Sequence, residues 1–459
     1  MPSEPQHGLI AALRASLQEA RARTLELVAD LSDEQMIGPR LDIVNPLRWE
    51  IAHLAWFQEY WVVRHFRGEP PTWPEADRLY DSARIPHDTR WDLPLPSKDA
   101  TLQYVRRVLE RMIEPAGKML PLTAGRDGHG EAYFLWLALM HEYMHAEAIT
   151  YTRQTLAYPA PRIRNSASSG APPHAESGTE APTDPDLPGD AEVPGGGFML
   201  GSPREAPFVF DNEQWAHPVV LEPFRIARAA VTNAQFMAFI EDGGYRRRKF
   251  WTDEGWRWRE RAGADHPVYW QRESGGRWLR RNFDVWTPLE SRHPALHVNW
   301  YEADAFCRWA GRRLPTEAEW EMAASAEPAP ARSGEGPRKR LFPWGDQPPN
   351  PALANLDWRA MGCHDAAALP SGESAFGCRQ MTGNVWEWTS SGFAPYPGFV
   401  PGPYKEYSAP WFEGHKVLRG GCWVTRSGLI RNAYRNFYQP HRRDVWAGFR
   451  TCAAGKTPA

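Results

Sequence analysis

Apolar residues recur with helical spacing through the N-terminal third of the chain. Over residues 8–31 one stripe includes Leu9, Leu13, Leu17, Leu25 and Leu27. The same periodicity predicts further helices over about 45–68, 97–116 and 131–156. Four helices of 18 or more residues joined by loops favour an up-and-down four-helix bundle, an architecture that builds metal sites in its core.

Local sequence signals mark the expected ends of these helices. Asn45 followed by Pro46 predicts an N-cap with proline at the first helical position, and Gly68 predicts the C-terminal end of the same helix. Ser97 is the expected N-cap of the third helix. The bundle is therefore predicted to occupy residues 1–158.

The pattern changes after residue 158. Residues 159–193 are rich in Pro, Ser and Gly and hold few large apolar side chains, so we expect a flexible linker. Residues 194–459 should form a second domain of short strands and turns. Within it, two helices are predicted over 300–324, meeting at Pro315, with Thr316 and Glu319 forming a capping box.

Charge and composition restrict the partners. The 459 residues carry 53 basic and 56 acidic side chains, which disfavours binding to nucleic acid or to an anionic membrane. No long apolar run or secretory signal is present, so we expect a cytoplasmic protein with a small-molecule partner. The five scattered cysteines are expected to be thiols, and the oligomeric state is left open.

The segment HEYMHAE, residues 141–147, holds the sharpest chemical motif. His141 and His145 are four residues apart on a predicted helix, so both imidazoles project from one face and can share a metal ion. The segment also matches H-E-x-x-H, in which Glu142 would be the general base of a zinc hydrolase. Two histidines on a helix surface are the structural alternative.

His53 adds a possible third ligand. It lies in the strongly apolar segment NPLRWEIAHLAWFQEYW, where a buried imidazole without a partner would be costly. Three neutral imidazoles from two helices could form a facial site that suits Fe, Cu, Ni or Zn. Glu147 is expected to be an outer acceptor or a structural residue rather than a fourth ligand.

These histidines and the motifs that follow them resemble one known family. The motifs are GGGFMLGS (195–202), GRRLPTEAEWEMAA (311–324), FPWGD (342–346), TGNVWEWT (382–389) and VLRGGCW (417–423). In this order they resemble the sulfoxide synthases of ergothioneine biosynthesis. The resemblance implies an α plus α+β fold, with a DinB-like four-helix bundle joined to a formylglycine-generating-enzyme-like domain that has a C-type-lectin-like core.

The resemblance also implies a reaction and a set of ligands. His53, His141 and His145 would hold a non-haem Fe(II). With O2 as co-substrate, the enzyme would join a chalcogen donor to C2 of the imidazole of hercynine, which is N-trimethylated histidine. Aromatic faces suit a trimethylammonium group, although tryptophans such as Trp386 and Trp388 could equally fill an ordinary core.

Further site residues follow from the same resemblance. The segment YRNFYQP implies that Asn436, Phe437 and Tyr438 contact substrate. A tyrosine that donates a proton is expected at Tyr404, with Tyr396 and Tyr407 as the alternatives. A noncatalytic ligand-binding module is the remaining alternative to an enzyme.

The expected donor site departs from the ergothioneine enzymes. Where these carry an Arg-x-x-Arg pair, the segment RIPHDTRWDLPLPS places His87 and Arg90, and Tyr438 stands in place of an aspartate. One guanidinium with hydroxyl-binding groups suits a sugar better than a dicarboxylate. The segment resembles the selenoneine synthase branch, in which a selenosugar donates selenium, selenium is oxidised, and elimination leads to selenoneine. Alternatively, Arg84 or Arg442 replaces the missing arginine and the donor is a cysteine-containing thiol.

Overall fold

The computed structural model describes residues 4–114, 129–164, 187, 189–328 and 338–454. The chain divides into two compact units, Met1–Arg164 and Asn165–Ala459. In the described residues no helix combines the length and the apolar character needed to cross a bilayer.

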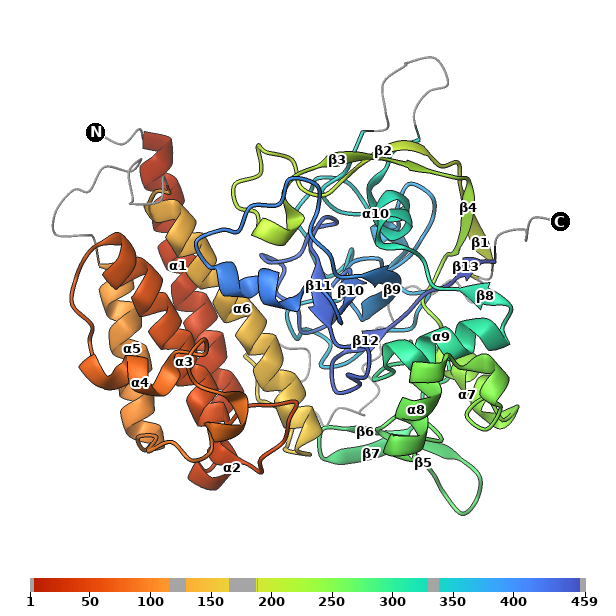
Figure 1. Ribbon diagram of the computed structural model, residues 1–459, viewed down its shortest axis with the longest axis horizontal. Coiled ribbons are helices and arrows are strands. Elements are labelled where there is room, and N and C mark those ends of the chain that lie inside the picture. Colours follow the sequence, from red (N-terminus) through yellow and green to blue (C-terminus); the bar gives the residue numbers. More distant parts are fainter. Residues whose placement is uncertain (1–3, 115–128, 165–186, 188, 329–337, 455–459) are drawn as a thin grey trace. The chain divides into compact units, whose positions relative to one another are not determined.

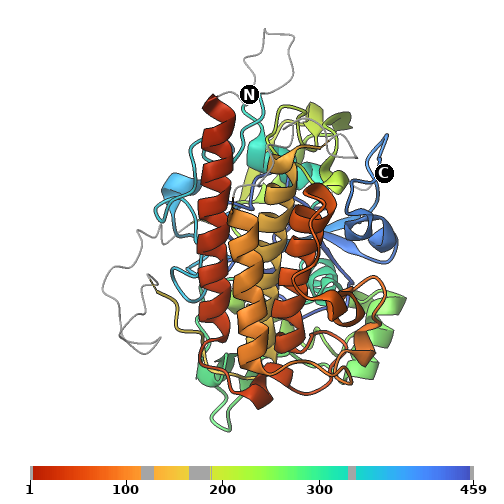
Figure 2. The same ribbon diagram turned by 90° about the vertical axis from the view of Figure 1, so that its left-hand side faces the viewer.

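The first unit is the predicted four-helix bundle. Its long helices are α1 (Glu4–Val28), α3 (Leu47–Gln58), α5 (Lys98–Ile113) and α6 (Glu131–Thr155), and α3 continues as a π-helix over Glu59–Phe66. Helices α1 and α3 each pack against both α5 and α6, and Figure 2 shows these helices side by side. Two short helices, α2 (Asp33–Ile37) and α4 (Asp77–Tyr80), lie in the connections.

The apolar stripe of α1 is shifted from the prediction at its first position. Leu13, Leu17 and Leu27 are buried as expected, but Leu9 is 38% exposed. Ile10 is buried in its place, because the core-facing row runs 10, 13, 17 on the observed helix.

Two of the three predicted helix ends are confirmed. Ser97 Oγ accepts the Ala100 N–H of α5, and Gly68, with φ +69°, follows the helix end and donates its N–H to the Arg64 carbonyl. The predicted cap at Asn45 is wrong, since α3 begins at Leu47 with Pro46 at the N-cap position. The Asn45 side-chain oxygen, which a helix cap would use, instead accepts from Arg90 Nη1 at 2.6 Å, and its amide donates to Glu50 Oε2 at 2.8 Å.

The described residues of the second unit form two four-stranded sheets, a three-stranded sheet and a hairpin (Figure 1). The sheet β1-β4-β13-β8 consists of Asp190–Val193, Phe224–Ala227, Cys452–Ala453 and Arg312–Arg313. The sheet β11-β10-β9-β12 consists of Asn436–Tyr438, Lys416–Arg419, Trp386–Gly392 and Ala447–Gly448. Strands β5 (Trp270–Arg272), β6 (Trp278–Asn282) and β7 (Val285–Pro288) form an antiparallel meander, and β2 (Gly196–Leu200) pairs with β3 (His217–Leu221).

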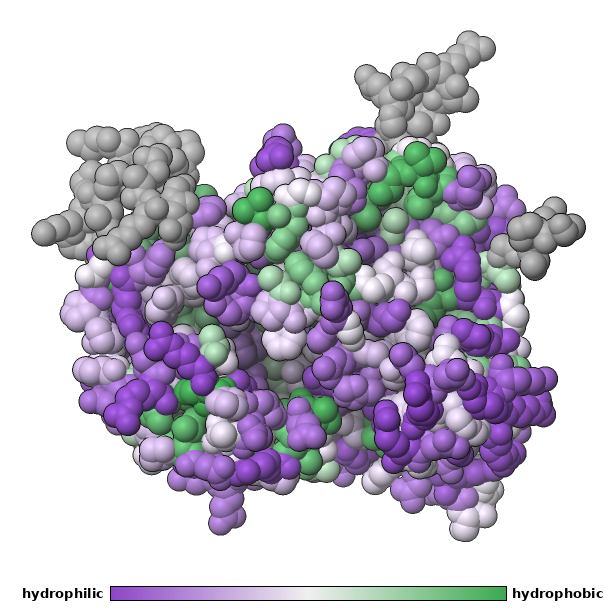
Figure 3. Space-filling view, viewed as in Figure 1, coloured by the Kyte–Doolittle hydropathy of each residue, from purple (hydrophilic) through white to green (hydrophobic). Residues whose placement is uncertain are grey.

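Among the described residues of this unit, four helices of eight or more residues accompany these strands. They are α7 (Asn233–Glu241), α8 (Asp253–Ala262), α9 (Trp300–Trp309) and α10 (Glu317–Ser325). The capping box of Thr316 and Glu319 at the start of α10 is confirmed. Trp386 and Trp388 are fully buried, as the ordinary core interpretation requires. The face over α7 and α8 is strongly hydrophilic in Figure 3, with Arg246, Arg247 and Arg248 exposed.

Both ends of the predicted linker are ordered, so its predicted bounds are wrong. Residues 190–193 form β1, which pairs with β4 and buries Ala191 and Val193. At the other end Ile163 is buried, and Arg153 Nη2 donates to the Pro159 carbonyl at 2.6 Å. Small apolar side chains and backbone pairing order these ends despite the polar composition. Residues 165–186 and 188 of the predicted linker lie outside the described residues.

Candidate metal centre

Three histidines converge in the bundle. One ring nitrogen each of His53, His141 and His145 lies within 4.8 Å of the other two. In the part of the chain that the structure describes, this is the only group of three or more histidine, cysteine or carboxylate side chains placed closely enough to hold a metal ion. His53 comes from α3, and the other two come from successive turns of α6.

Hydrogen bonds orient two of the three rings. His53 Nδ1 donates to the Tyr80 carbonyl at 2.7 Å, and His145 Nδ1 donates to Glu50 Oε1 at 2.7 Å. Since a carbonyl and a carboxylate can only accept, each of these rings carries a proton on Nδ1, and its Nε2 is the nitrogen that faces a metal ion. This arrangement, with the far nitrogen anchored to an acceptor, is typical of histidines that bind metals.

Aromatic rings pack against the site. Trp49 stacks on His53 with centroids 4.7 Å apart, and Phe57 stacks on His141 at 3.6 Å. His141 Nε2 and His145 Nε2 are 3.2 Å apart, close enough to share one cation or one proton. The walls therefore hold the imidazoles in place and keep water from their faces.

Burial keeps the imidazoles of His53 and His141 neutral. It lowers the pKa of His53 and of His141 well below the ordinary histidine value, and the neighbouring His145 lowers both further. Burial alone would raise the pKa of Glu50, but hydrogen bonds from His145 and Asn45 outweigh it and leave this pKa below its ordinary value. The neutral imidazoles of His53 and His141 match the protonation state that divalent metal ions require of a histidine ligand.

Glu142 does not face the three histidines' shared space. Its carboxylate is fully buried and accepts hydrogen bonds from Arg21 Nε at 2.9 Å, Thr24 Oγ1 at 2.8 Å and Gln58 Nε2 at 2.8 Å. Two of these donors come from α1 and one from α3, and Glu142 points away from the metal-binding face as expected for a residue one position after His141 on a helix. The geometry therefore disfavours the zinc hydrolase, in which this carboxylate would be the base.

The structure identifies Glu50 as an orienting residue that the sequence analysis missed. The predicted outer acceptor, Glu147, is buried, but the acceptor for His145 is Glu50, 95 residues away in sequence. The available signal was its spacing: Glu50 precedes His53 by three residues and so lies on the same face of α3.

Of the two residues of the predicted donor loop, Arg90 packs on Trp49, which stacks on His53. Arg90 Nη1 donates to Asn45 Oδ1 at 2.6 Å, and its Cζ is 3.9 Å from the centroid of Trp49. Burial lowers the pKa of Arg90 to about 10, against the opposing effect of Glu50. His87 Nε2 donates to the Val44 carbonyl at 2.8 Å.

The predicted substrate residues of the second unit lie on and around β11. Phe437 stacks on Phe393 with centroids 4.0 Å apart, and Tyr438 lies under the Arg442 guanidinium at 5.2 Å. Asn436 is half-buried on the same strand, and its Oδ1 accepts the Phe437 N–H at 2.9 Å.

The candidate tyrosines occupy different surroundings. The ring of Tyr404 is 5.9 Å from that of Tyr407, which in turn is 5.8 Å from Phe437. Tyr407 shares a 3.3 Å hydrogen bond with the Tyr434 hydroxyl. Tyr396 is only 5% exposed, and burial raises its pKa well above the ordinary value. The structure thus places Tyr404 and Tyr407 in the aromatic cluster of Phe437.

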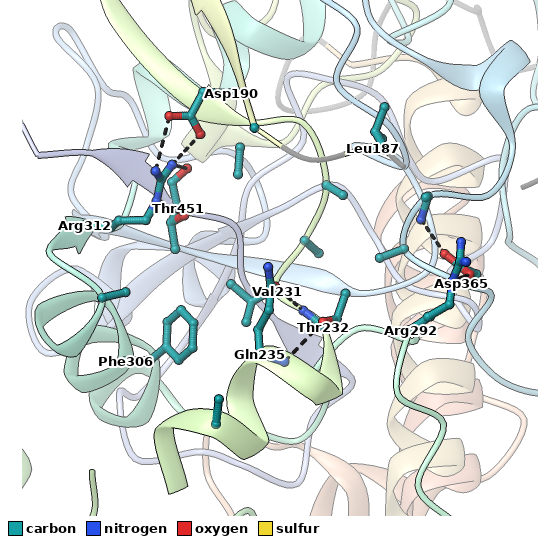
Figure 4. A pocket seen from close by; sticks show the side chains of 18 of the residues that line it. Leu187, Asp190, Val231, Thr232, Gln235, Arg292, Phe306, Arg312, Asp365 and Thr451 are labelled. Carbon is teal, nitrogen blue, oxygen red and sulfur yellow. Dashed lines mark hydrogen bonds and ion pairs between the residues drawn. The ribbon is translucent and has the colours of Figure 1, made fainter. Parts of the chain in front are cut away.

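The second unit also contains a cavity of about 580 Å³ (Figure 4). None of the predicted site residues lines it. Its charged side chains form two ion pairs, Arg312 with Asp190 at 2.6 Å and Arg292 with Asp365. Because these charges already have partners, this cavity does not match the expected donor or substrate site.

Comparison with known proteins defines the class. Residues 16–149 match the DinB superfamily, and residues 176–454 match the sulfatase-modifying factor enzyme 1-like domain. The chain is therefore a two-domain protein that joins a DinB-type helical bundle to a domain of the formylglycine-generating-enzyme type, and the predicted fold class is confirmed.

Full-length relatives narrow the class to a family. A hercynine oxygenase of Mycolicibacterium thermoresistibile is 37% identical over 96% of this chain and 94% of its own length. That of Mycobacterium tuberculosis is 36% identical over 95% of this chain and 97% of its own. A formylglycine-generating enzyme of Streptomyces coelicolor is 32% identical over only 55% of this chain and 82% of its own. The chain belongs to the hercynine oxygenase family, and thus to the oxidoreductases.

Proposed function

We propose that this protein is a non-haem Fe(II), O2-dependent synthase that joins a chalcogen donor to C2 of the hercynine imidazole. The observation that carries the proposal is the convergence of one ring nitrogen each of His53, His141 and His145 within 4.8 Å, with the Nδ1 atoms of His53 and His145 bonded to acceptors. A set of nitrogen ligands without a carboxylate leaves positions for O2 and a substrate on a bound iron. When bound, the iron would supply the redox chemistry of O2.

The protein's own residues hold and orient the reactants in this proposal. The aromatic faces around Phe437 suit the trimethylammonium group of hercynine, which cannot donate hydrogen bonds. Asn436 and Tyr438 supply polar contacts from the same strand. Tyr404 holds the proton that the reduction of O2 consumes, since a phenol remains protonated at neutral pH.

The proposed donor is a selenosugar. The paired arginines of a dicarboxylate site have no counterpart among the described residues of this loop: Arg90 remains, while Arg84 is 81% exposed beside Asp81. Arg442, the other candidate replacement, is paired with Asp444 at 2.6 Å. A lone guanidinium beside His87 and Asn45 suits the hydroxyls of a sugar.

The overall reaction is balanced with one O2. A selenol and hercynine lose one hydrogen each as the C–Se bond forms, one oxygen atom is retained on selenium, and the other leaves as water. Elimination of the sugar and reduction of selenium by a thiol then give selenoneine. A cysteine-containing thiol would follow the same first step with sulfur in place of selenium.

Two experiments test the proposal. Anaerobically purified protein should bind about one Fe(II), and His141→Ala and His145→Ala should lose it, while His65→Ala, a histidine of the same bundle outside the triad, should retain it. Bound zinc with hydrolase activity would contradict the synthase.

The donor is tested by mass spectrometry of the adduct. Fe(II) enzyme, O2 and hercynine are incubated with a selenosugar, its thiosugar analogue, cysteine or γ-glutamylcysteine. The selenosugar should give the fastest adduct formation, and Tyr404→Phe should slow it. Preferential use of cysteine or γ-glutamylcysteine would overturn the selenium assignment and leave the hercynine synthase in place.

A further inference from the structure

A continuous chain of hydrogen bonds joins the predicted metal ligand His145 to the donor-loop residue Arg90. His145 Nδ1 bonds to Glu50 Oε1 at 2.7 Å, Glu50 Oε2 accepts from Asn45 Nδ2 at 2.8 Å, and Asn45 Oδ1 accepts from Arg90 Nη1 at 2.6 Å. The chain connects α6, α3, Asn45 two positions before α3, and the loop after α4.

The chemistry of the four groups fixes the direction of every bond. A carboxylate can only accept and a guanidinium can only donate, so the Asn45 amide must turn its NH2 toward Glu50 and its oxygen toward Arg90. Alanine at position 45 would break both bonds. Charge-assisted bonds of this kind are stronger than neutral ones and hold a side chain in one orientation.

A second branch from Arg90 reaches His53. The Arg90 guanidinium lies over Trp49 at 3.9 Å, and Trp49 stacks on His53 with an interplanar angle of 5°. Consecutive carbonyls anchor the two rings, Leu79 accepting from Trp49 Nε1 and Tyr80 from His53 Nδ1, both at 2.7 Å. Arg90 thus contacts Trp49, which stacks on His53, and Asn45, which bonds to the acceptor of His145.

Arg90 differs from the fully buried arginines of the bundle. Arg21 and Arg153 each pair directly with a carboxylate, Glu142 and Asp30. In the described part of the chain, Arg90 has no carboxylate within ion-pair distance, and its buried Nε has no hydrogen-bond partner. Its hydrogen bonds connect it to a carboxylate, Glu50, through Asn45.

We propose that Asn45 and Arg90 are positioning residues that hold Glu50, and through it His145, in the orientation required for metal binding. The inference rests on the metal site of the proposed function but not on the identity of the donor or substrate. If the proposal is correct, the donor loop also helps to orient the metal ligands through Arg90.

Metal affinity tests the proposal without turnover. Full-length apo-protein is titrated with Co(II), and both the dissociation constant and the visible Co(II) absorption are recorded. Asn45→Ala and Arg90→Ala should each weaken Co(II) binding by about 10-fold, the low end for loss of an outer hydrogen-bond partner. Arg78→Ala, an exposed arginine of α4, is the matched control and should bind as the wild type does.

The double variant distinguishes a relay from two separate effects. If Asn45 and Arg90 act in series, the double alanine variant should be about as weak as either single variant, whereas independent effects would multiply to about 100-fold. Arg90→Lys keeps a charged donor for Asn45 and should recover most of the lost affinity, which a merely structural role would not predict. Thermal unfolding of each apo-variant checks that it is folded.

The positioning role would be overturned if both folded single variants bound Co(II) with unchanged affinity. Multiplicative effects in the double variant would overturn it as well, even if the enzyme makes product. Conversely, the predicted affinities together with no product from hercynine would overturn the proposed function and leave the relay intact.

Discussion

The buried ion pair behind the metal centre provides a quantitative prediction about Glu142. Its carboxylate and the Arg21 guanidinium are 0% and 1% exposed, and the carboxylate accepts two further hydrogen bonds, from Thr24 and Gln58. Glu142→Ala leaves the Arg21 charge buried without its partner. Removing one member of a buried pair typically costs about 3–5 kcal/mol, and we expect the free energy of unfolding to fall by that amount.

Urea denaturation followed by far-ultraviolet circular dichroism measures this change, because the helices of the bundle dominate that signal. The control is the double variant Arg21→Met with Glu142→Leu, which replaces both charges by apolar groups of similar length. It should recover most of the lost stability, since buried pairs can often be exchanged for apolar groups at little cost.

The two interpretations of Glu142 predict different results. If Glu142 is a structural residue, its replacement lowers the free energy of unfolding. The three histidines of the folded variant should still bind Co(II). A Glu142→Ala variant with unchanged stability, or one that selectively loses a metal-dependent hydrolase activity, would refute the structural interpretation.

Three further predictions concern other residues. Glu50→Gln should weaken Co(II) binding by about 10- to 100-fold, measured by titration, because His145 loses its charged acceptor; Glu50→Asp should be milder. His297 is buried, which lowers its pKa to about 3; since the unfolded state binds a proton below about pH 6.5, stability should fall as pH drops from about 6.5 toward 3, by about 2 kcal/mol at pH 5. The midpoints of urea denaturation at about pH 6.5 and about pH 5 should differ less in His297→Phe than in the wild-type protein. An equal difference would exclude His297 as the cause of the lost stability. His87→Arg should slow the use of a selenosugar relative to γ-glutamylcysteine in the adduct assay; an unchanged ratio would show that position 87 does not select the donor.

Local sequence patterns predicted the helical elements of the bundle well. The spacing of Leu13 and Leu17 placed α1, and the four-residue spacing of His141 and His145 placed both rings on one face of α6. These features depend on neighbours within one or two turns, so periodicity is sufficient. The same locality explains why Ser97 was identified as a cap.

Competition from distant partners explains where the predictions failed. Asn45 has the right side chain and position for a helix cap, but it bonds with Glu50 and Arg90 instead. Residues 190–193 lie in a polar, proline-rich stretch, yet pairing with β4 makes them a strand. In both cases a tertiary interaction outweighed the local preference.

The sequence by itself determined the helices, the order of the two domains and two histidines on one helical face. Only the tertiary structure decided that His53 joins them, that Glu50 rather than Glu147 orients His145, and that Glu142 faces Arg21. The physical reason is that α3 and α6 are about 90 residues apart along the chain and meet only through packing. Spacing along one helix is set by its geometry, whereas the partner across a helix interface is set by which buried donors and acceptors the fold brings within bonding distance.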